Sequence, residues 1–268
     1  MGKIRLDILL HQKGLAASRE KARAMILAGE VSINGVLYDK PGSAVEDSSN
    51  IVIKSSIPPY VSRGGLKLQK AIQVFKMDFK DKIVWDVGAS TGGYTDCALK
   101  HGARKVYALD VGYGQLDWTL RNDKRVVNIE KTNIRYFDPQ DLGELVDIIT
   151  IDVAFISTAK VFPVVKHGLK EDGRIITLIK PQFEAGRDKV GKKGVVKDKD
   201  VHRQVLVSCI NYANQASLYC RDLTYSPIKG PQGNIEYFVL LDRGTDNREG
   251  LEEVIDQVVL EAHQQLGG

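Results

Sequence analysis

Three glycines between two apolar runs constrain the fold of this chain more than any other feature. Residues 82–86 predict a buried strand, and residues 94–100 can continue as a helix. The segment between them, Asp86-Val-Gly-Ala-Ser-Thr-Gly-Gly93, therefore forms a strand-to-helix turn. At such a turn, backbone N–H groups and the positive end of a helix can approach a ligand closely. A second apolar run ends at Asp110, whose carboxylate could hold two ribose hydroxyls. Together these features predict a site for a nucleoside cofactor.

The order of the glycines bears on which cofactor this is. A dinucleotide turn reads G-x-G-x-x-G, so that a pyrophosphate can lie against bare backbone. Here the order is Gly88-x-Ser90-x-Gly92-Gly93, with Asp86 in front, where a carboxylate would repel a pyrophosphate but could accept a hydrogen bond from an amino-acid ammonium. The pattern resembles the S-adenosylmethionine loop of class I methyltransferases. The alternative is an ordinary glycine-rich turn of an α/β protein. The resemblance implies that the cofactor contacts Asp86, Gly88, Ser90, Gly92, Gly93 and Asp110.

The cysteines and the hydropathy pattern limit the class of protein. Cys97, Cys209 and Cys220 form no C-x-x-C pair and have no histidine at ligand spacing. They predict a reduced, cytoplasmic protein without a metal. No apolar segment follows Met1, and no run of about 18 apolar residues occurs, so we expect neither an export signal nor a membrane span.

Charge is distributed unevenly along the chain, although the net charge is only +4. Residues 246–268 contain six acidic residues and one arginine, whereas residues 61–76 contain four basic residues and no acidic one. Residues 180–199 contain seven basic residues and three acidic ones. Basic segments that flank a cofactor site suit a polyanionic substrate. The alternative is that these runs are solvated faces.

Residues 1–56 predict a small α+β domain. A short amphipathic helix begins at Arg5 and ends near Gly14, and Ser18 can cap a second helix over residues 19–28. Gly29 would end that helix. Asn34-Gly35 suits the type I′ turn of a hairpin, and residues 50–54 supply a final strand.

This arrangement resembles the S-four (S4) RNA-binding domain, which is named after a ribosomal protein. The resemblance rests on Arg5-Leu6-Asp7, Ser18-Arg19 and Val31-x-Ile33-Asn34-Gly35, which match in order and spacing. It implies that the second helix and the turn after it present basic groups to structured RNA. The alternative is a small module used only for packing. The residues that we expect to contact RNA are Arg5, Arg19, Lys21, Arg23 and Arg63.

Residues 57–62 form a linker that two prolines stiffen, and residues 63–268 form a second domain. Its pattern alternates between strand and helix, which predicts a Rossmann-like α/β domain with a seven-stranded, mostly parallel sheet covered by helices on both faces. The expected strands are 82–87, 105–110, 125–129, 146–152, 174–180, 218–225 and 235–242. The expected helices are 65–76, 93–101, 157–170, 198–214 and 248–266.

Four charged residues stand where strands or helices begin or end. Asp152 and Lys180 each end an apolar run, Glu236 lies near the start of the last one, and Lys67 lies in the first helix of the second domain. Ligands of open α/β sheets lie beyond the carboxyl ends of the strands. If the last strand is antiparallel, as in class I methyltransferases, its start lies at the same edge. These four side chains could therefore converge beside the cofactor.

Seven motifs are spread along the second domain: Ser62-Arg-Gly-Gly-x-Lys67, Asp86 to Gly93, Asp110-Val-Gly-Tyr-Gly-Gln-Leu116, Thr132-Asn-x-Arg135, Asp152-Val153, Lys180-Pro-Gln-Phe-Glu184 and Gly233-Asn-x-Glu236. With the S4-like domain before them, they resemble the TlyA family, haemolysin-like ribosomal RNA methyltransferases with an S4 domain followed by an FtsJ-like methyltransferase domain. The resemblance implies 2′-O-methylation of ribose in ribosomal RNA, with ribosomal RNA or a ribosomal subunit as partner. It also implies a catalytic tetrad of Lys67, Asp152, Lys180 and Glu236, with Asn133 and Asp152 at the cofactor. Ala154 stands where the family often has serine.

A mechanism follows for these residues, and so do alternatives. Lys180 could be the general base for the 2′-hydroxyl, with Asp152 orienting it and Glu236 holding Lys67 or the ribose. A non-catalytic RNA-binding protein would not need the cofactor loop. A base methyltransferase would be expected to carry N-P-P-[FYW] or a catalytic cysteine, and neither pattern is present. A membrane-lytic protein has only the family's haemolysin label in its favour. The target nucleotide and the oligomeric state stay open.

Overall fold

The computed structural model describes residues 3–27, 30–34, 36–53, 59–230 and 232–267. The chain divides into two compact units, Met1–Pro59 and Tyr60–Gly268. Each unit has a hydrophobic core of its own.

The first unit packs two helices on short strands. Ser18 accepts a hydrogen bond from the backbone N–H of Lys21 (3.1 Å), as expected for the cap of the second helix. Asn34 has a positive φ of 51°, but its turn partner Gly35 lies outside the described residues, as does the expected helix stop at Gly29. The core includes Leu6, Leu10, Ala22, Ile26 and Val31. The elements are β1 (Lys3–Arg5), α1 (Leu6–Gln12), α2 (Arg19–Leu27), β2 (Val31–Ile33), β3 (Val36–Tyr38), β4 (Ala44–Glu46) and β5 (Ile51–Ile53). The pair formed by β1 and β4 was not expected.

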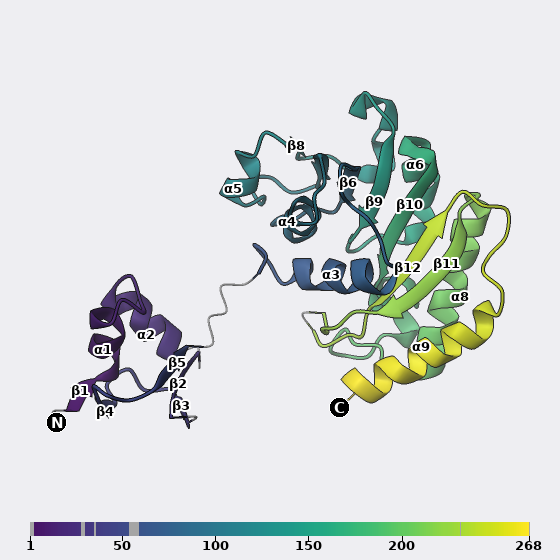
Figure 1. The fold of residues 1–268 in the computed structure, drawn as a ribbon. Coiled ribbons are helices and arrows are strands. Elements are labelled where there is room, and N and C mark those ends of the chain that lie inside the picture. The colour runs from purple at the N-terminus through teal and green to yellow at the C-terminus, as the bar shows by residue number, and fades with distance from the viewer. Residues whose placement is uncertain (1–2, 28–29, 35, 54–58, 231, 268) are drawn as a thin grey trace. The chain divides into compact units, whose positions relative to one another are not determined.

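The second unit contains the expected seven-stranded sheet, in the order β11-β12-β10-β9-β6-β7-β8 (Figure 1). Strands β8, β7, β6, β9 and β10 pair in parallel, and β12 is antiparallel to both β10 and β11. The fold class predicted from the sequence is therefore confirmed. The strands are β6 (Ile83–Val87), β7 (Lys105–Leu109), β8 (Val126–Ile129), β9 (Val146–Ile151), β10 (Leu169–Ile179), β11 (Tyr219–Tyr225) and β12 (Tyr237–Asp242).

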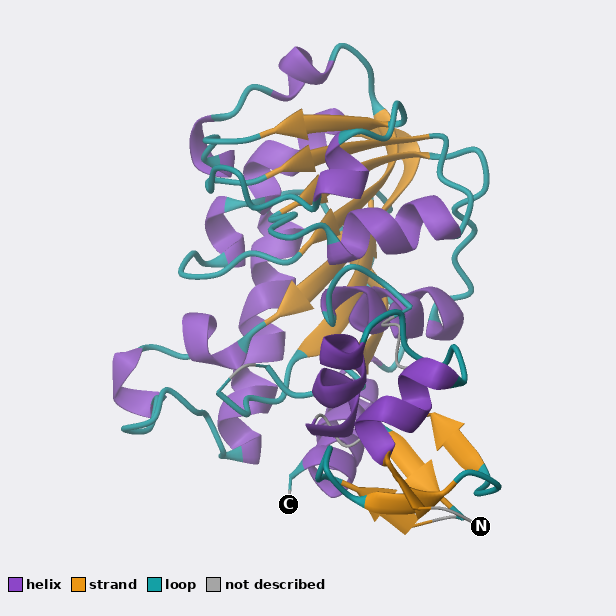
Figure 2. Ribbon diagram, turned by 90° about the vertical axis from the view of Figure 1, so that its left-hand side faces the viewer, coloured by secondary structure: helices purple, strands orange, loops and turns teal. Residues whose placement is uncertain are grey.

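Helices cover both faces of this sheet (Figure 2). Alternate strand residues point to opposite faces, so Val84 packs with α3 and α4 while Trp85 packs in the other core layer with α8 and α9. Both side chains are fully buried, which makes the sheet the hydrophobic centre of the unit. The helices are α3 (Gly64–Val74), α4 (Gly93–Lys100), α5 (Trp118–Arg121), α6 (Phe162–Val165), α7 (Pro181–Glu184), α8 (Lys199–Gln215) and α9 (Leu251–Leu266).

The expected helix over residues 157–170 is wrong. The structure has a 3₁₀ turn, the single-turn helix α6 and a second 3₁₀ turn, after which β10 begins at Leu169. Pro163 cannot donate a backbone hydrogen bond, so it stands in the first turn of α6 instead of inside a longer helix. Strand β10 is consequently longer than predicted.

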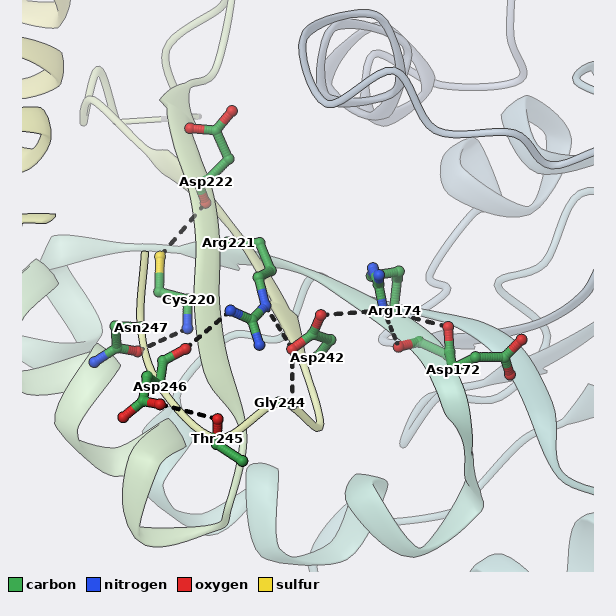
Figure 3. A network of polar contacts seen from close by, with 11 residues as sticks. Asp172, Arg174, Cys220, Arg221, Asp222, Asp242, Gly244, Thr245, Asp246 and Asn247 are labelled. Carbon is green, nitrogen blue, oxygen red and sulfur yellow. Dashed lines mark hydrogen bonds and ion pairs between the residues drawn. The ribbon is translucent and has the colours of Figure 1, made fainter. Parts of the chain in front are cut away.

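A polar network fixes the segment between β12 and α9 (Figure 3). The carboxylate of Asp242 forms ion pairs with Arg221 (2.7 Å) and Arg174 (3.1 Å), which belong to the two strands beside its own. Arg221 also donates to the carbonyl of Asp246 (2.9 Å), and Gly244 leaves no room for a Cβ against that guanidinium. This network holds β12 in register at the end of the strand opposite Glu236.

Candidate active site

A cavity of about 860 Å³ opens at the carboxyl edge of the sheet. The chain runs outward from β6 to β8 and then returns to β9 on the other side of β6, so the cavity lies at the reversal of strand order. Open α/β sheets bind their ligands at this point. Most of the residues that the sequence assigned to cofactor and chemistry line this one cavity: Lys67, Gly88, Ser90, Gly93, Asp110, Asn133, Asp152, Lys180 and Glu236.

The glycine loop follows β6 and approaches β9 closely. Gly88 has φ +89°, and a Cβ there would lie 2.5 Å from the carbonyl oxygen of Asp152. A Cβ on Gly93 would lie 2.2 Å from the hydroxyl of Ser62, where α4 begins against the start of α3. Only glycine fits at these positions, so the loop presents bare backbone to the cavity. Gly92 does not line the cavity and instead packs against Leu120.

Asp86 lies beneath this loop. It is 1% exposed and is not among the residues that line the cavity. Its carboxylate accepts hydrogen bonds from the hydroxyls of Thr95 (2.7 Å) and Thr150 (3.0 Å), which belong to α4 and β9. Burial raises the pKa of Asp86 to about 7, although the two hydroxyls oppose the shift. In this position Asp86 ties three elements together under the loop.

Asp110 stands at the end of β7 on the cavity wall. Its carboxylate accepts hydrogen bonds from the backbone N–H groups of Ser90 (2.8 Å) and Gly112 (2.7 Å). These bonds orient the carboxylate, and each oxygen keeps a lone pair for a further donor. Asn133 faces the same cavity and caps a 3₁₀ turn through the backbone N–H of Arg135 (3.0 Å).

Two ion pairs occupy the inner end of the cavity. The ammonium of Lys67 on α3 lies 2.6 Å from Glu236, and that of Lys180 after β10 lies 2.5 Å from Asp152 after β9. Glu236 comes just before the antiparallel strand β12, which brings it to the same edge as the other three. The side chains of all four are at most 18% exposed, so the charges interact with little screening by water.

Glu236 is the most deeply buried of the four. Burial raises its pKa, although the neighbouring Lys67 opposes the shift. Its Oε1 has no hydrogen-bond partner among the described residues, and a Cβ on Gly230 would lie 2.5 Å from that oxygen. A buried acceptor without a partner is costly in a folded protein. This oxygen can receive a donor from a bound ligand.

Sequence reasoning missed two residues, Phe155, which lines this cavity, and Glu184, which hydrogen-bonds the lining residue Ser157. Phe155 is 90% exposed, has φ +61°, and packs on Phe183 with ring centroids 4.8 Å apart. Glu184 accepts from the hydroxyl of Ser157 (2.7 Å) and the backbone N–H of Thr158 (2.7 Å), which ties the loop after β9 to the turn after Lys180. The position of Glu184 inside a motif was the only signal in the sequence.

The basic residues expected to contact RNA have different surroundings. Arg5 (3.1 Å) and Arg19 (3.0 Å) both pair with the fully buried carboxylate of Asp7, and their side chains stay about half exposed. Lys21 and Arg23 are exposed on α2. In the second unit, Arg63 is exposed and lines the cavity.

The fold and this site define a class I methyltransferase preceded by an S4 domain. The FtsJ-like methyltransferase model matches residues 60–243, and the S4 domain model matches residues 4–51. The chain therefore belongs to the FtsJ-like methyltransferase family, as predicted from its motifs.

Relatives match over nearly their full length. The chain is 40% identical over 261 residues to the 16S/23S rRNA (cytidine-2′-O)-methyltransferase TlyA of Mycobacterium tuberculosis, covering 96% of this chain and 97% of TlyA. It is 45% identical over 235 residues to Hemolysin A of Brachyspira hyodysenteriae, covering 87% of this chain and 98% of that protein. A solved structure from Streptococcus thermophilus is 41% identical and superposes with a TM-score of 0.78, covering 100% of this chain and 98% of that one.

Within the part of the chain that the structure describes, no helix is both long and apolar enough to cross a bilayer.

Proposed function

We propose that this protein transfers a methyl group from S-adenosylmethionine to a ribose 2′-hydroxyl in ribosomal RNA. The observation that carries the proposal is the convergence of the pairs Lys67–Glu236 and Lys180–Asp152 on the cavity that the glycine loop lines. The family and the activity printed for TlyA support the same conclusion.

The cavity fits S-adenosylmethionine on two observations. The loop at Gly88 and Gly93 brings bare backbone to its wall, and the oriented carboxylate of Asp110 suits a ribose diol. When bound there, S-adenosylmethionine supplies an electrophilic methyl carbon. We assign its contacts to Gly88, Ser90, Gly93, Asp110, Asn133 and Asp152, with Asp86 and Gly92 supporting the loop from behind.

Lys180 acts as the general base in this proposal. A ribose 2′-hydroxyl is a weak nucleophile until its proton is removed, and the Nζ of Lys180 removes it when neutral. Asp152 orients that nitrogen through their contact of 2.5 Å. Lys67, held by Glu236, positions the ribose oxygen, so that alignment of the reacting atoms supplies much of the remaining rate.

The first unit supplies RNA affinity. Residues 4–51 match the S4 domain family. A stretch of the chain is also 36% identical over 70 residues to small ribosomal subunit protein uS4 of Caldivirga maquilingensis. Lys21 and Arg23 project from α2 and, with the exposed parts of Arg5 and Arg19, suit phosphate contacts.

Analysis of the methylated product tests the proposed function. Unmodified ribosomal RNA is incubated with the protein and labelled S-adenosylmethionine, digested to nucleosides and analysed by mass spectrometry. We expect a 2′-O-methylated nucleoside. A methylated base, or RNA binding without methyl transfer, would contradict the proposal and favour one of the alternatives.

Two substitutions of Lys180 test its role as the base. Lys180→Ala should slow methyl transfer by about a hundredfold or more, the usual worth of a positioned base. Lys180→Arg should be equally inactive, because a guanidinium keeps its charge and cannot accept the proton. Calorimetry should show nearly unchanged cofactor binding in both. An active Arg variant would mean that only positive charge is needed there.

A further inference from the structure

A lysine-rich turn follows Lys180 along the chain, after the sheet edge at which Lys67, Asp152, Lys180 and Glu236 lie. After Lys180 the chain passes through α7 into residues 191–197, which we call the basic turn. Lys192 and Lys193 stand exposed at its tip. Two backbone hydrogen bonds close it: Gly191 N–H donates to the carbonyl of Val195 (3.1 Å), and Gly194 N–H donates to that of Gly191 (2.8 Å).

Two fully buried polar side chains hold the stem of the basic turn. Asn234 accepts from the backbone N–H of Val196 (3.0 Å) and donates to the carbonyl of Gly194 (2.8 Å). His202 hydrogen-bonds the carbonyl of Val196 (3.0 Å). Val196 is itself only 2% exposed. The backbone of the turn is therefore ordered from below while its lysines point to solvent.

The same anchor connects the basic turn to the wall of the active-site cavity. Asn234 lies two residues before Glu236, and its carbonyl accepts from the backbone N–H of Gly230 (2.9 Å). Gly230 lines the cavity against Glu236. The segment that holds the basic turn is therefore also the segment that forms this wall of the cavity.

The charge of the basic turn and of the residues on either side of it indicates what this segment contacts. Residues 187–199 carry six exposed basic side chains and two acidic ones, and one of the acids, Asp198, caps α8 by accepting from the backbone N–H of Asp200 (2.8 Å). Because the backbone of the basic turn is already ordered, only the lysine side chains lose conformational freedom when they meet a phosphate. The basic side chains are Arg187, Lys189, Lys192, Lys193, Lys197 and Lys199.

We propose that the basic turn binds the phosphates of the RNA strand that flanks the target nucleotide. This inference rests on the proposed function, since it takes the substrate to be RNA. It assigns to the methyltransferase domain a share of RNA affinity that the S4 domain alone would not supply.

The test compares two double variants of the full-length protein. Lys192→Ala with Lys193→Ala removes the charges at the tip of the turn. Lys80→Ala with Lys124→Ala is the matched control, because these two lysines are also exposed but precede β6 and β8, at the opposite edge of the sheet. Binding to deproteinised ribosomal RNA is measured at several salt concentrations, together with S-adenosylmethionine affinity.

We expect the tip variant to bind RNA about tenfold more weakly. The slope of log affinity against log salt concentration should be shallower by about 1 to 2, because binding with fewer phosphate contacts releases fewer counterions. Its S-adenosylmethionine affinity should equal that of the wild type. An unchanged RNA affinity and slope in the tip variant, or an equal loss in the control, would overturn the inference. Either result leaves the proposed function standing if the wild type still methylates RNA. If the wild type transfers no methyl group to RNA, the proposed function fails instead.

Discussion

Buried His202 should make the stability of this protein depend on pH in a way that one substitution removes. The ring is fully buried, with Nε2 at 3.0 Å from the carbonyl of Val196 and Nδ1 at 2.7 Å from the hydroxyl of Tyr237. A carbonyl only accepts, so Nε2 carries the proton and Nδ1 accepts. His263 lies 3.0 Å from Nδ1. Burial lowers the pKa of His202 from 6.5 to about 4, and His263 adds to the shift.

The sign and size of the effect follow from this pKa. Between about pH 6.5 and pH 4 the unfolded chain binds a proton at this histidine that the native state does not. The free energy of unfolding therefore falls as pH decreases, by about 1.4 kcal/mol per pH unit across that window. From about pH 7 to pH 4.5 the loss attributable to His202 is about 2.5 kcal/mol. Asp86, whose pKa is raised from 3.8 to about 7, acts in the opposite direction, because its carboxyl holds a proton in the native state that the unfolded chain releases.

Urea unfolding of the wild type and of His202→Gln over this pH range separates the two contributions. The variant loses a pH-independent amount of stability because its hydrogen bonds change. The difference in free energy of unfolding between wild type and variant should also become about 2.5 kcal/mol less favourable to the wild type from pH 7 to pH 4.5. His167→Gln, at an exposed position, is the control. Parallel pH profiles for wild type and His202→Gln would refute the reasoning.

Two further substitutions test the site. Gly88→Ala places a Cβ 2.5 Å from the carbonyl of Asp152 at φ +89°, so we expect about 2 kcal/mol or more of destabilisation and weaker S-adenosylmethionine binding; calorimetry that finds wild-type affinity would contradict this. Glu184→Gln removes the charged acceptor of Ser157 and Thr158 and replaces one oxygen by a donor, so turnover should drop several-fold while the free energy of unfolding changes by only about 1–2 kcal/mol; steady-state kinetics with unchanged kcat and KM would show that this anchor does not matter.

Local pattern was enough to predict much of the fold. Each strand of the large sheet shows as a short apolar run, and six of the seven observed strands begin within two residues of the predicted position. The glycine loop was also readable, because the need for bare backbone at Gly88 and Gly93 is a property of the turn itself. The failed helix over 157–170 came from apolar spacing that tolerated Pro163, where the chain instead breaks into short turns.

Contacts between distant residues could not be read in this way. The sequence placed Asp86 at the cofactor, but its position beneath the loop depends on Thr95 and Thr150, which arrive from other elements. The sequence left open whether Glu236 holds Lys67 or the ribose, and the pair forms across 169 residues because β12 runs antiparallel.

The sequence by itself determined which segments form the strands of the large sheet, where the chain turns on glycine, and to which family it belongs, because these follow from residues close together along the chain. The tertiary structure decided which carboxylate meets which lysine, that Glu184 joins the loop after β9 to the turn after Lys180, and that Asn234 and His202 order the basic turn. A side chain's partner depends on sheet order and on the direction of each strand. Those are settled only when the whole sheet buries both of its faces at once.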